Sequence, residues 1–430
     1  MFKAIDAMQP SFIERPLAKV WSEISPLYCV DESEWLKELI PLAQASESER
    51  EQTRRQATQL IEQVRADKKA VQMIDALLLE YSLDTREGIL LMCLAEALMR
   101  VPDSHTADSL IRDKLSVADW KAHLRHSDSL FVNASTWGLM LTGKVVTLDE
   151  SSEGKPASVI NRLVNKMSEP VIRQAMHQAM KIMGHQFVLG RDIDEAQKNG
   201  EGPRTNGFTY SFDMLGEAAL TQEDAKAYLN DYLQAIESVG EAKASYQGPS
   251  PSVSIKLSAL HPRYEAANQD RMMTEMFETV LVLLKRAREK EVAITIDAEE
   301  ADRLELSLAL FEKLYRDPVV KGWGKFGLVV QAYSKRALPV ITWLATLARE
   351  QGDVIPMRLV KGAYWDSEIK LCQQTGHHGY PVFTRKEGTD VSYLACARFL
   401  LSDHVRGLIY PQFASHNAHT IAAIAGMATH

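Results

Sequence analysis

The stretch that decides the fold is IPMRLVKGAYWDSEIK, residues 355–370. It predicts a buried strand over 357–360, a loop, and a helix that begins near Asp366. Two basic and two aromatic side chains leave the end of this strand together. Glycine lets backbone approach a ligand closely, cations bind phosphate or other acceptors, and aromatic rings cover a flat ring. The stretch therefore indicates a flavin or nucleotide site, with candidates Arg358, Lys361, Gly362, Ala363, Tyr364 and Trp365.

Similar β-rich runs lie on both sides of this strand and alternate with helix-like segments. Strands that alternate with helices indicate parallel βα units, either in a doubly wound sheet or in a (β/α)8 barrel. The predicted strands are 208–212, 253–257, 293–297, 328–331, 357–360 and 408–413, and the predicted helices between them are 222–236, 271–288, 303–315, 338–350 and 391–401.

Polar side chains at the carboxyl ends of these strands favour the barrel. In a barrel all strand ends build one face, whereas an open sheet brings together only those at its switch point. No GxGxxG follows any strand, although a dinucleotide-binding open sheet typically has one. We therefore predict a TIM-like (β/α)8 barrel with about six of its eight units in this chain. The polar residues are Asp213, Glu217, Lys256, Asp297, Glu299, Gln331, Arg358, Lys361, His416 and Asn417.

The first part of the chain is predicted to be helical. A charged run at 47–69 indicates a solvated helix, an apolar helix follows at 84–100, and further helical segments extend to 183. We divide the chain into a helical arm region, 1–204, and a C-terminally incomplete barrel, 205–430.

Composition restricts the function classes. Apolar residues make up 46% and charged residues 25%, as in a soluble globular protein. The net charge of −8 and the absence of a basic block argue against a nucleic-acid partner. No apolar run reaches the ~18 residues of a membrane span, and the four cysteines form no CxxC, so a cytosolic protein without a zinc site is expected. His377 and His378 have no acid at ligand spacing, so no metal is predicted.

Lys256 lies in a β-rich run, where an ammonium group needs a partner. It could act as a Schiff-base lysine of an aldolase-like barrel, because a desolvated lysine becomes nucleophilic. It could instead bind a substrate carboxylate, or simply form an ion pair with Asp297 or Glu299.

Eight segments resemble the proline dehydrogenase domain of the bifunctional bacterial flavoenzyme proline utilization A, and the resemblance extends from the helical arm to the last residues. They are FVNASTWGLMLTGKVV (131–146), YSFDMLGEAALT (210–221), SIKLSALHPRY (254–264), IDAEEADRLE (296–305), RLVKGAYWDSEIK (358–370), GYPVFTRK (379–386), TDVSYLACARFLL (389–401) and YPQFASHNAHT (410–420). The resemblance implies a (β/α)8 barrel that binds FAD, oxidises L-proline to 1-pyrroline-5-carboxylate and passes the electrons to a membrane quinone. It also implies a cytoplasmic protein that contacts the inner membrane peripherally and forms a homodimer.

The resemblance assigns residues by position. The active-site aspartate of the family matches Asp297, its flavin-N5-facing arginine matches Arg358, its substrate-side lysine matches Lys256, and Tyr364 joins this catalytic group. A fixed cation near N5 stabilises negative charge on the flavin ring, and the aspartate holds the cations in place. The flavin contacts of the family match Ala298, Gln331, Arg358, Lys361, Gly362, Ala363, Trp365, Thr384, Ser415, His416 and Asn417.

The chain departs from the family pattern at both ends. The ribbon-helix-helix DNA-binding domain of some members has no counterpart, so a repressor role is not expected. The last two barrel strands, the YxxRR motif and the aldehyde dehydrogenase half have none either, so we expect a fragment with little proline turnover of its own. The alternatives are a Schiff-base aldolase that uses Lys256 and a non-catalytic scaffold.

Overall fold

The computed structural model describes residues 2–66, 188–214, 218–242 and 251–429, with a few positions between 103 and 109. Met1–Glu62 and Asp192–His430 form one compact unit, and Gln63–Arg191 form another. The helices predicted at 84–100 and onward to 183 lie outside the described residues, as does Glu217. The predicted domain division near residue 204 stays a prediction. All other candidate site residues belong to the first unit.

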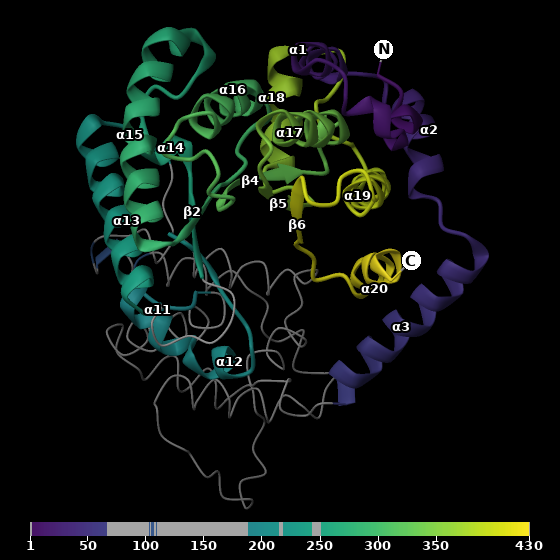
Figure 1. Ribbon diagram of the computed structural model, residues 1–430, viewed down its shortest axis with the longest axis horizontal. Coiled ribbons are helices and arrows are strands. Elements are labelled where there is room, and N and C mark those ends of the chain that lie inside the picture. The colour runs from purple at the N-terminus through teal and green to yellow at the C-terminus, as the bar shows by residue number, and fades with distance from the viewer. Residues whose placement is uncertain are drawn as a thin grey trace, which may run out of the picture. The chain divides into compact units, whose positions relative to one another are not determined.

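A six-stranded parallel sheet forms the centre of this unit (Figure 1). The strands follow one another in chain order, each hydrogen-bonded to the next. A doubly wound sheet would reverse its strand order, so the sequential order confirms the barrel class, with six parallel strands in place. The strands are β1 (Ser211–Asp213), β2 (Ser252–Ile255), β3 (Ala293–Ile296), β4 (Phe326–Gln331), β5 (Ile355–Val360) and β6 (Ile409–Phe413).

Helices connect successive strands, as the sequence predicts. In α15 the buried residues recur at helical spacing, for example Met272, Met276 and Val280, so one apolar face packs inward. The sequence missed the short helix after β2 and the helix after β6. The connecting helices are α13 (Gln222–Ala242), α14 (Leu257–Leu260), α15 (Gln269–Lys290), α16 (Leu304–Tyr315), α17 (Ala337–Gln351), α18 (Trp365–Thr375), α19 (Lys386–Leu400) and α20 (Ala418–Ala428), and α11 (Ile193–Asn199) and α12 (Glu201–Thr205) precede β1.

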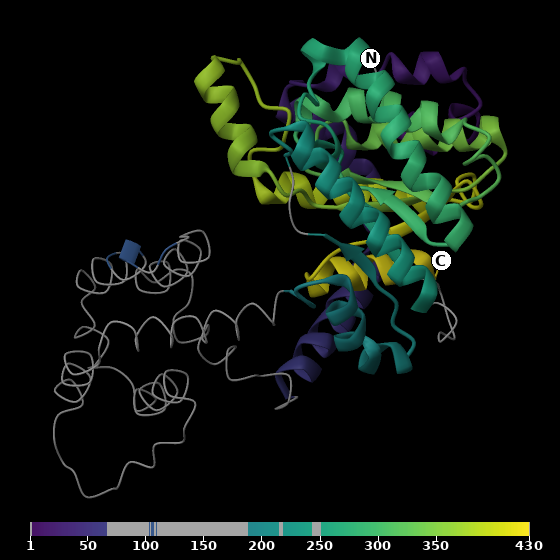
Figure 2. The same ribbon diagram turned by 90° about the vertical axis from the view of Figure 1, so that its left-hand side faces the viewer.

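The N-terminal arm packs on the outside of the barrel helices. Helix α1 (Leu17–Trp21) lies on α17, and α2 (Glu32–Ala43) lies on α19. The rings of Trp21 and Trp343 meet edge to face with their centroids 5.3 Å apart. Figure 2 shows the purple arm outside the green helices, with the strands beneath them. The predicted helix at 47–69 is α3 (Glu47–Ala66) in the described part.

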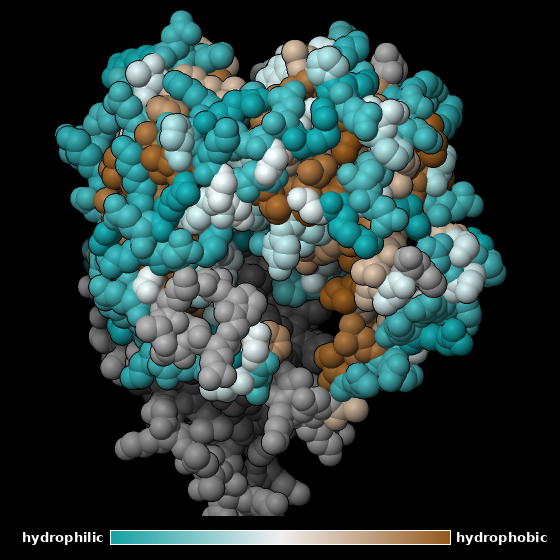
Figure 3. All heavy atoms as spheres, in the orientation of Figure 1, coloured by the Kyte–Doolittle hydropathy of each residue, from teal (hydrophilic) through white to brown (hydrophobic). Residues whose placement is uncertain are grey.

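Hydropathy differs across the molecular face shown in Figure 3. Hydrophilic side chains cover most of the α13 and α15 side, whereas apolar side chains gather nearer to β5, β6 and α20. Ile421 of α20 is 42% exposed. Among the described residues, no helix is both long enough and apolar enough to cross a membrane.

Candidate active site

Four charged side chains meet at the carboxyl ends of β1, β2, β3 and β5. Nζ of Lys256 lies 2.9 Å from Oδ1 of Asp213 and 3.2 Å from Oδ2 of Asp297. Nη1 of Arg358 lies 3.5 Å from Oδ1 of Asp297. Two cations thus face two carboxylates, and we call Asp213, Lys256, Asp297 and Arg358 the charge cluster.

Backbone pairing brings these side chains together. Asp213 pairs with Ser254 across β1 and β2, and the amide of Asp297 donates to the carbonyl of Ile255. In β5, Met357 and Leu359 are buried, whereas Arg358 between them is only half-buried. Since successive side chains of a strand point to opposite faces, Arg358 faces the other side, toward the barrel interior.

Burial and charge set the protonation of the cluster. Burial raises the pKa of Asp297 above its ordinary value, while the Lys256 ammonium acts in the opposite direction. Burial alone would lower the pKa of Lys256, but Asp297 and Asp213 outweigh it and raise that pKa above its ordinary value. Lys256 is therefore an ammonium ion at neutral pH, whereas a Schiff-base lysine needs a neutral amine. This protonation argues against the aldolase interpretation.

Gln331, at the end of β4, links two loops of the predicted flavin site. Its Nε2 donates to the carbonyl of Glu299 over 2.9 Å, and its Oε1 accepts from the amide of Ala363 over 2.9 Å. Gly362 has φ +147°, and an added Cβ would lie 2.3 Å from the ring of Tyr333. Glycine is therefore needed here to accommodate a ring of the protein itself, a reason that the sequence did not reveal.

Two side chains of the same loop are held by their neighbours. The indole Nε1 of Trp365 donates to the carbonyl of Phe383 over 2.9 Å, yet the residue remains 41% exposed. Its ring is thus fixed in orientation and open to a partner. Lys361 forms an ion pair with Asp390 of α19. Tyr364, between these two, is half-buried and stands at the N-cap position of α18, where its side chain forms no capping hydrogen bond.

The remaining predicted flavin contacts have partners outside this loop. The amide of Thr384 donates to the carboxylate of Glu32 over 3.0 Å, and its hydroxyl does so over 3.2 Å. Oδ1 of Asn417 accepts from the amide of Thr420 over 2.9 Å and so caps α20. The Asn417 amide donates to Oγ of Ser415 over 3.1 Å, and His416 is exposed.

Sequence reasoning missed three residues around the charge cluster. Nη2 of Arg358 donates to Oγ of Ser211 over 2.6 Å, and Nη1 donates to Oγ of Ser254 over 3.3 Å. The hydroxyl of Tyr232 accepts from the backbone amide of Lys256 over 3.1 Å, and burial raises its pKa to about 12. The signal for Ser254 was its place two residues before Lys256, which puts both side chains on one face of β2.

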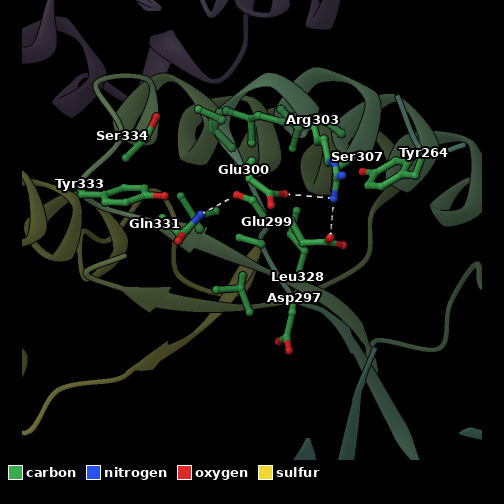
Figure 4. Close-up of a pocket in the computed structure, with 18 residues that line it drawn as sticks. Tyr264, Asp297, Glu299, Glu300, Arg303, Ser307, Leu328, Gln331, Tyr333 and Ser334 are labelled. Carbon is green, nitrogen blue, oxygen red and sulfur yellow. Dashed lines mark hydrogen bonds and ion pairs between the residues drawn. The ribbon is translucent and has the colours of Figure 1, made fainter. Parts of the chain in front are cut away.

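A small cavity lies between the β3–α16 loop and β4 (Figure 4). Glu299, Glu300 and Arg303 meet at it, whereas the Asp297 carboxylate points away from them. Ala298 also lines this cavity. Its volume is about 30 Å³, somewhat more than the ~10–15 Å³ that a cavity needs to hold one water molecule. The cavity is thus far too small for a flavin ring. Asp297 of the charge cluster belongs to its lining, but the carboxylate that contacts Lys256 and Arg358 points the other way. No cluster of metal-ligating side chains occurs among the described residues.

The fold and the site together define a class of protein. It is a parallel barrel that carries two cations, two carboxylates and an exposed indole ring near the carboxyl ends of its strands. A family model described as "Proline dehydrogenase" matches residues 196–430. The chain belongs to the proline dehydrogenase family.

Relatives and solved structures agree with this family. The chain is 50% identical over 407 residues to "Bifunctional protein PutA" of Escherichia coli (strain K12), which covers 93% of this chain but only 30% of that protein. It is 26% identical over 244 residues to "Proline dehydrogenase 1" of Bacillus subtilis (strain 168), covering 56% of this chain and 68% of that one. A crystal structure of proline utilization A from Bradyrhizobium japonicum matches with TM-score 0.68 and 43% identity over 94% of this chain and 40% of that one. The chain thus spans about a third of the length of the bifunctional relatives.

Two further family models match the N-terminal part. One is described as "Proline utilization A proline dehydrogenase N-terminal domain" and matches residues 22–65. The other is described as "DNA-binding domain of Proline dehydrogenase" and matches residues 73–187. The second description stands against the prediction of no nucleic-acid partner. Nearly all of its residues lie outside the described part, so the structure itself does not test the prediction.

Proposed function

We propose that this chain carries the proline-oxidising part of a longer protein. The reaction is FAD-dependent oxidation of L-proline to 1-pyrroline-5-carboxylate, with the electrons passed to a membrane quinone, the first step of proline catabolism to glutamate. The family and the names of the relatives support the substrate. The observation that carries the proposal is the charge cluster. In it Arg358 and Lys256 both form ion pairs with Asp297, next to the loop of residues 361–365.

The residues at this face fit a flavin. Gly362 and Ala363 expose backbone at the end of β5, and the fixed Trp365 ring is open for stacking. Gln331 and Lys361 supply an amide and an ammonium group at neighbouring strand ends. These residues would hold the cofactor, together with Thr384 and residues 415–417 from the two adjoining loops. When bound, FAD supplies the two-electron acceptor for oxidation of a C–H bond next to an amine.

The charged residues have separate roles in this proposal. L-Proline loses two electrons and two protons as its C–N bond becomes a double bond. Arg358 provides a fixed positive charge where negative charge develops, and such preorganised electrostatics is usually the largest catalytic contribution. Asp297 forms ion pairs with both cations and keeps them in place. Lys256, protonated, provides the second positive charge on the substrate side.

Location and assembly extend the same proposal. A cytoplasmic protein that contacts the inner membrane peripherally would deliver electrons to a quinone without a spanning helix. A homodimer is proposed as well. The alternative function is a non-catalytic scaffold, and the next experiment distinguishes it from proline oxidation.

The test uses the full-length protein and follows flavin absorbance anaerobically. L-Proline should bleach the flavin, and Arg358→Met should slow bleaching by a factor of ~100 to 1,000, typical of one lost electrostatic donor. Arg406→Met is the matched control, because Arg406 is 79% exposed and pairs only with Asp403 in the described part. A protein without flavin, or equal rates in Arg358→Met and the wild type, would refute the proposal.

A further inference from the structure

The Arg358 side chain crosses the barrel interior. It starts from β5, yet its guanidinium contacts side chains of β1, β2 and β3, with Ser211 lying 147 residues earlier in the chain. A long side chain with several rotatable bonds samples many positions unless hydrogen bonds fix it. Two of the three contacts that fix this guanidinium are serine hydroxyls.

The two serines form one unit on neighbouring strands. Their Oγ atoms lie 3.2 Å apart, and β1 and β2 pair in parallel at this level. Ser254 is fully buried. A buried hydroxyl without a partner costs stability, and within the described part Ser254 finds its side-chain partners in Ser211 and Arg358. The contact with the guanidinium therefore explains why a hydroxyl group is buried at position 254, whereas packing of the strand does not require one.

The serines also explain why Arg358 stays at a distance from Asp297. A guanidinium and a carboxylate normally approach to about 2.7–2.9 Å, often through two parallel bonds. Here the contact is single and 3.5 Å long. The shorter bond of Arg358 goes to Ser211, over 2.6 Å, so the guanidinium is held on the β1–β2 side. Asp297 therefore keeps its Oδ2 free for Lys256.

We propose that Ser211 and Ser254 are positioning residues that hold the Arg358 guanidinium away from full pairing with Asp297, and so set where both cations of the charge cluster act. The proposal rests on the proposed function for its kinetic readout. Without the hydroxyls, Arg358 pairs with Asp297 through both nitrogens and displaces Lys256. Within the described part, the charged group that contacts the guanidinium is Asp297, which also pairs with Lys256.

The kinetic test is a double-mutant cycle in the full-length protein. Ser254→Ala should lower the rate of flavin bleaching by proline about tenfold, the effect of one typical hydrogen bond to a charged group. It should have no further effect in an Arg358→Met background, because the serine acts through the arginine. Ser252→Ala is the matched control on the same face of β2, and its hydroxyl forms no hydrogen bond within the described part. Ser211→Thr, which keeps the hydroxyl, should retain the rate that Ser211→Ala loses.

A second readout does not depend on catalysis. Crystal structures of the wild type and of the Ser211→Ala/Ser254→Ala double variant should differ in the guanidinium position, with the variant showing two short bonds from Arg358 to Asp297. An unmoved guanidinium would overturn the proposal even if proline oxidation itself failed. Wild-type bleaching with an unchanged rate in Ser254→Ala, or an equal loss in the Arg358→Met background, would also overturn it and leave the proposed function standing.

Discussion

At the scale of single residues, Lys256 keeps its charge because of the carboxylates on both sides of it. Asp297 is buried enough for its own pKa to rise, and the ammonium group beside it acts against that rise. Asp213 is more exposed and adds a second contact. The ion pair that the sequence offered as the simplest interpretation of Lys256 is thus present, and it also serves the proposed site.

Replacing Lys256 by methionine should make stability depend on pH. Without the ammonium, the pKa of Asp297 rises further above its unfolded value of about 3.8. A carboxyl with a raised folded pKa binds its proton more tightly in the folded state, so stability falls as pH rises through that window. We expect Lys256→Met to lose on the order of 2 kcal/mol at high pH and much less near pH 4.

Thermal unfolding of Lys256→Met and the wild type between about pH 4 and pH 8 measures this difference. Asp297→Asn in the Lys256→Met background is the control, because it removes the titrating group and should remove the pH dependence. A difference in melting temperature that stays constant across this range would contradict the assignment.

Single-residue inference from sequence succeeded where a strand end exposed a charge. Asp297, Lys256 and Arg358 could be chosen because charged residues are rare at the ends of buried strands. Ser211 could not be chosen, and Ser254 was marked only by sharing a face of β2 with Lys256, because a serine in a strand carries no signal about which distant side chain it meets. Gly362 was assigned to ligand approach, and nothing in the sequence pointed to Tyr333 as its neighbour.

At the scale of elements, α17 is unusual because residues 337–348 are all buried. A helix that is apolar on every side must be covered on every side. Helix α17 contacts β4 and β5 on one side and the arm helix α1 on another. Trp343 is fully buried there, next to Trp21.

Trp343→Ala should therefore destabilise the protein by about 3–5 kcal/mol, as other large-to-small core substitutions do. Urea unfolding followed by circular dichroism measures this loss. Trp343→Phe is the control, because it keeps a ring against Trp21 and removes an indole N–H that finds no partner among the described residues. A decrease in the free energy of unfolding below about 1 kcal/mol in Trp343→Ala would show that packing of the arm on α17 contributes little to stability.

The sequence predicted elements well where periodicity was clear. All six predicted strands overlap observed ones, although the first starts at Ser211 instead of residue 208. Helix α20 was missed because its segment AHTIAAIAGMA has no polar face, and its N-cap, Asn417, was assigned only to the flavin. Leu257 was counted with β2 because it is apolar, but it opens α14.

At the scale of the whole unit, the arm and the barrel form one body. Lys335 donates to the carbonyl of Val30 over 2.9 Å, and Arg349 donates to the carbonyl of Ile13 over 2.8 Å. Glu32 holds Thr384, and Glu49 pairs with Arg398 of α19. Contacts between residues more than 300 apart leave no local pattern, so the sequence could not reveal that the arm packs on these helices.

Leu39→Ala in α2 should therefore weaken α19 as well. Leu39 is fully buried, and such a substitution costs about 2–5 kcal/mol. Hydrogen exchange should speed up in both α2 and α19 by the same free energy, because cooperative units open together. Ile40→Ala, at a neighbouring position that is 46% exposed, is the control and should change little. Faster exchange confined to α2 would show that the arm opens independently.

The sequence distance between the arm and its partners matters during synthesis. Glu32 leaves the ribosome 352 residues before Thr384, which is roughly 20–70 s at ordinary elongation rates. Throughout that time the apolar face of α2, with Trp35 and Leu39, has no barrel helix to cover it. The nascent chain thus displays the apolar face of α2 as a ready site for a holding chaperone, and that site closes only when α19 has been made.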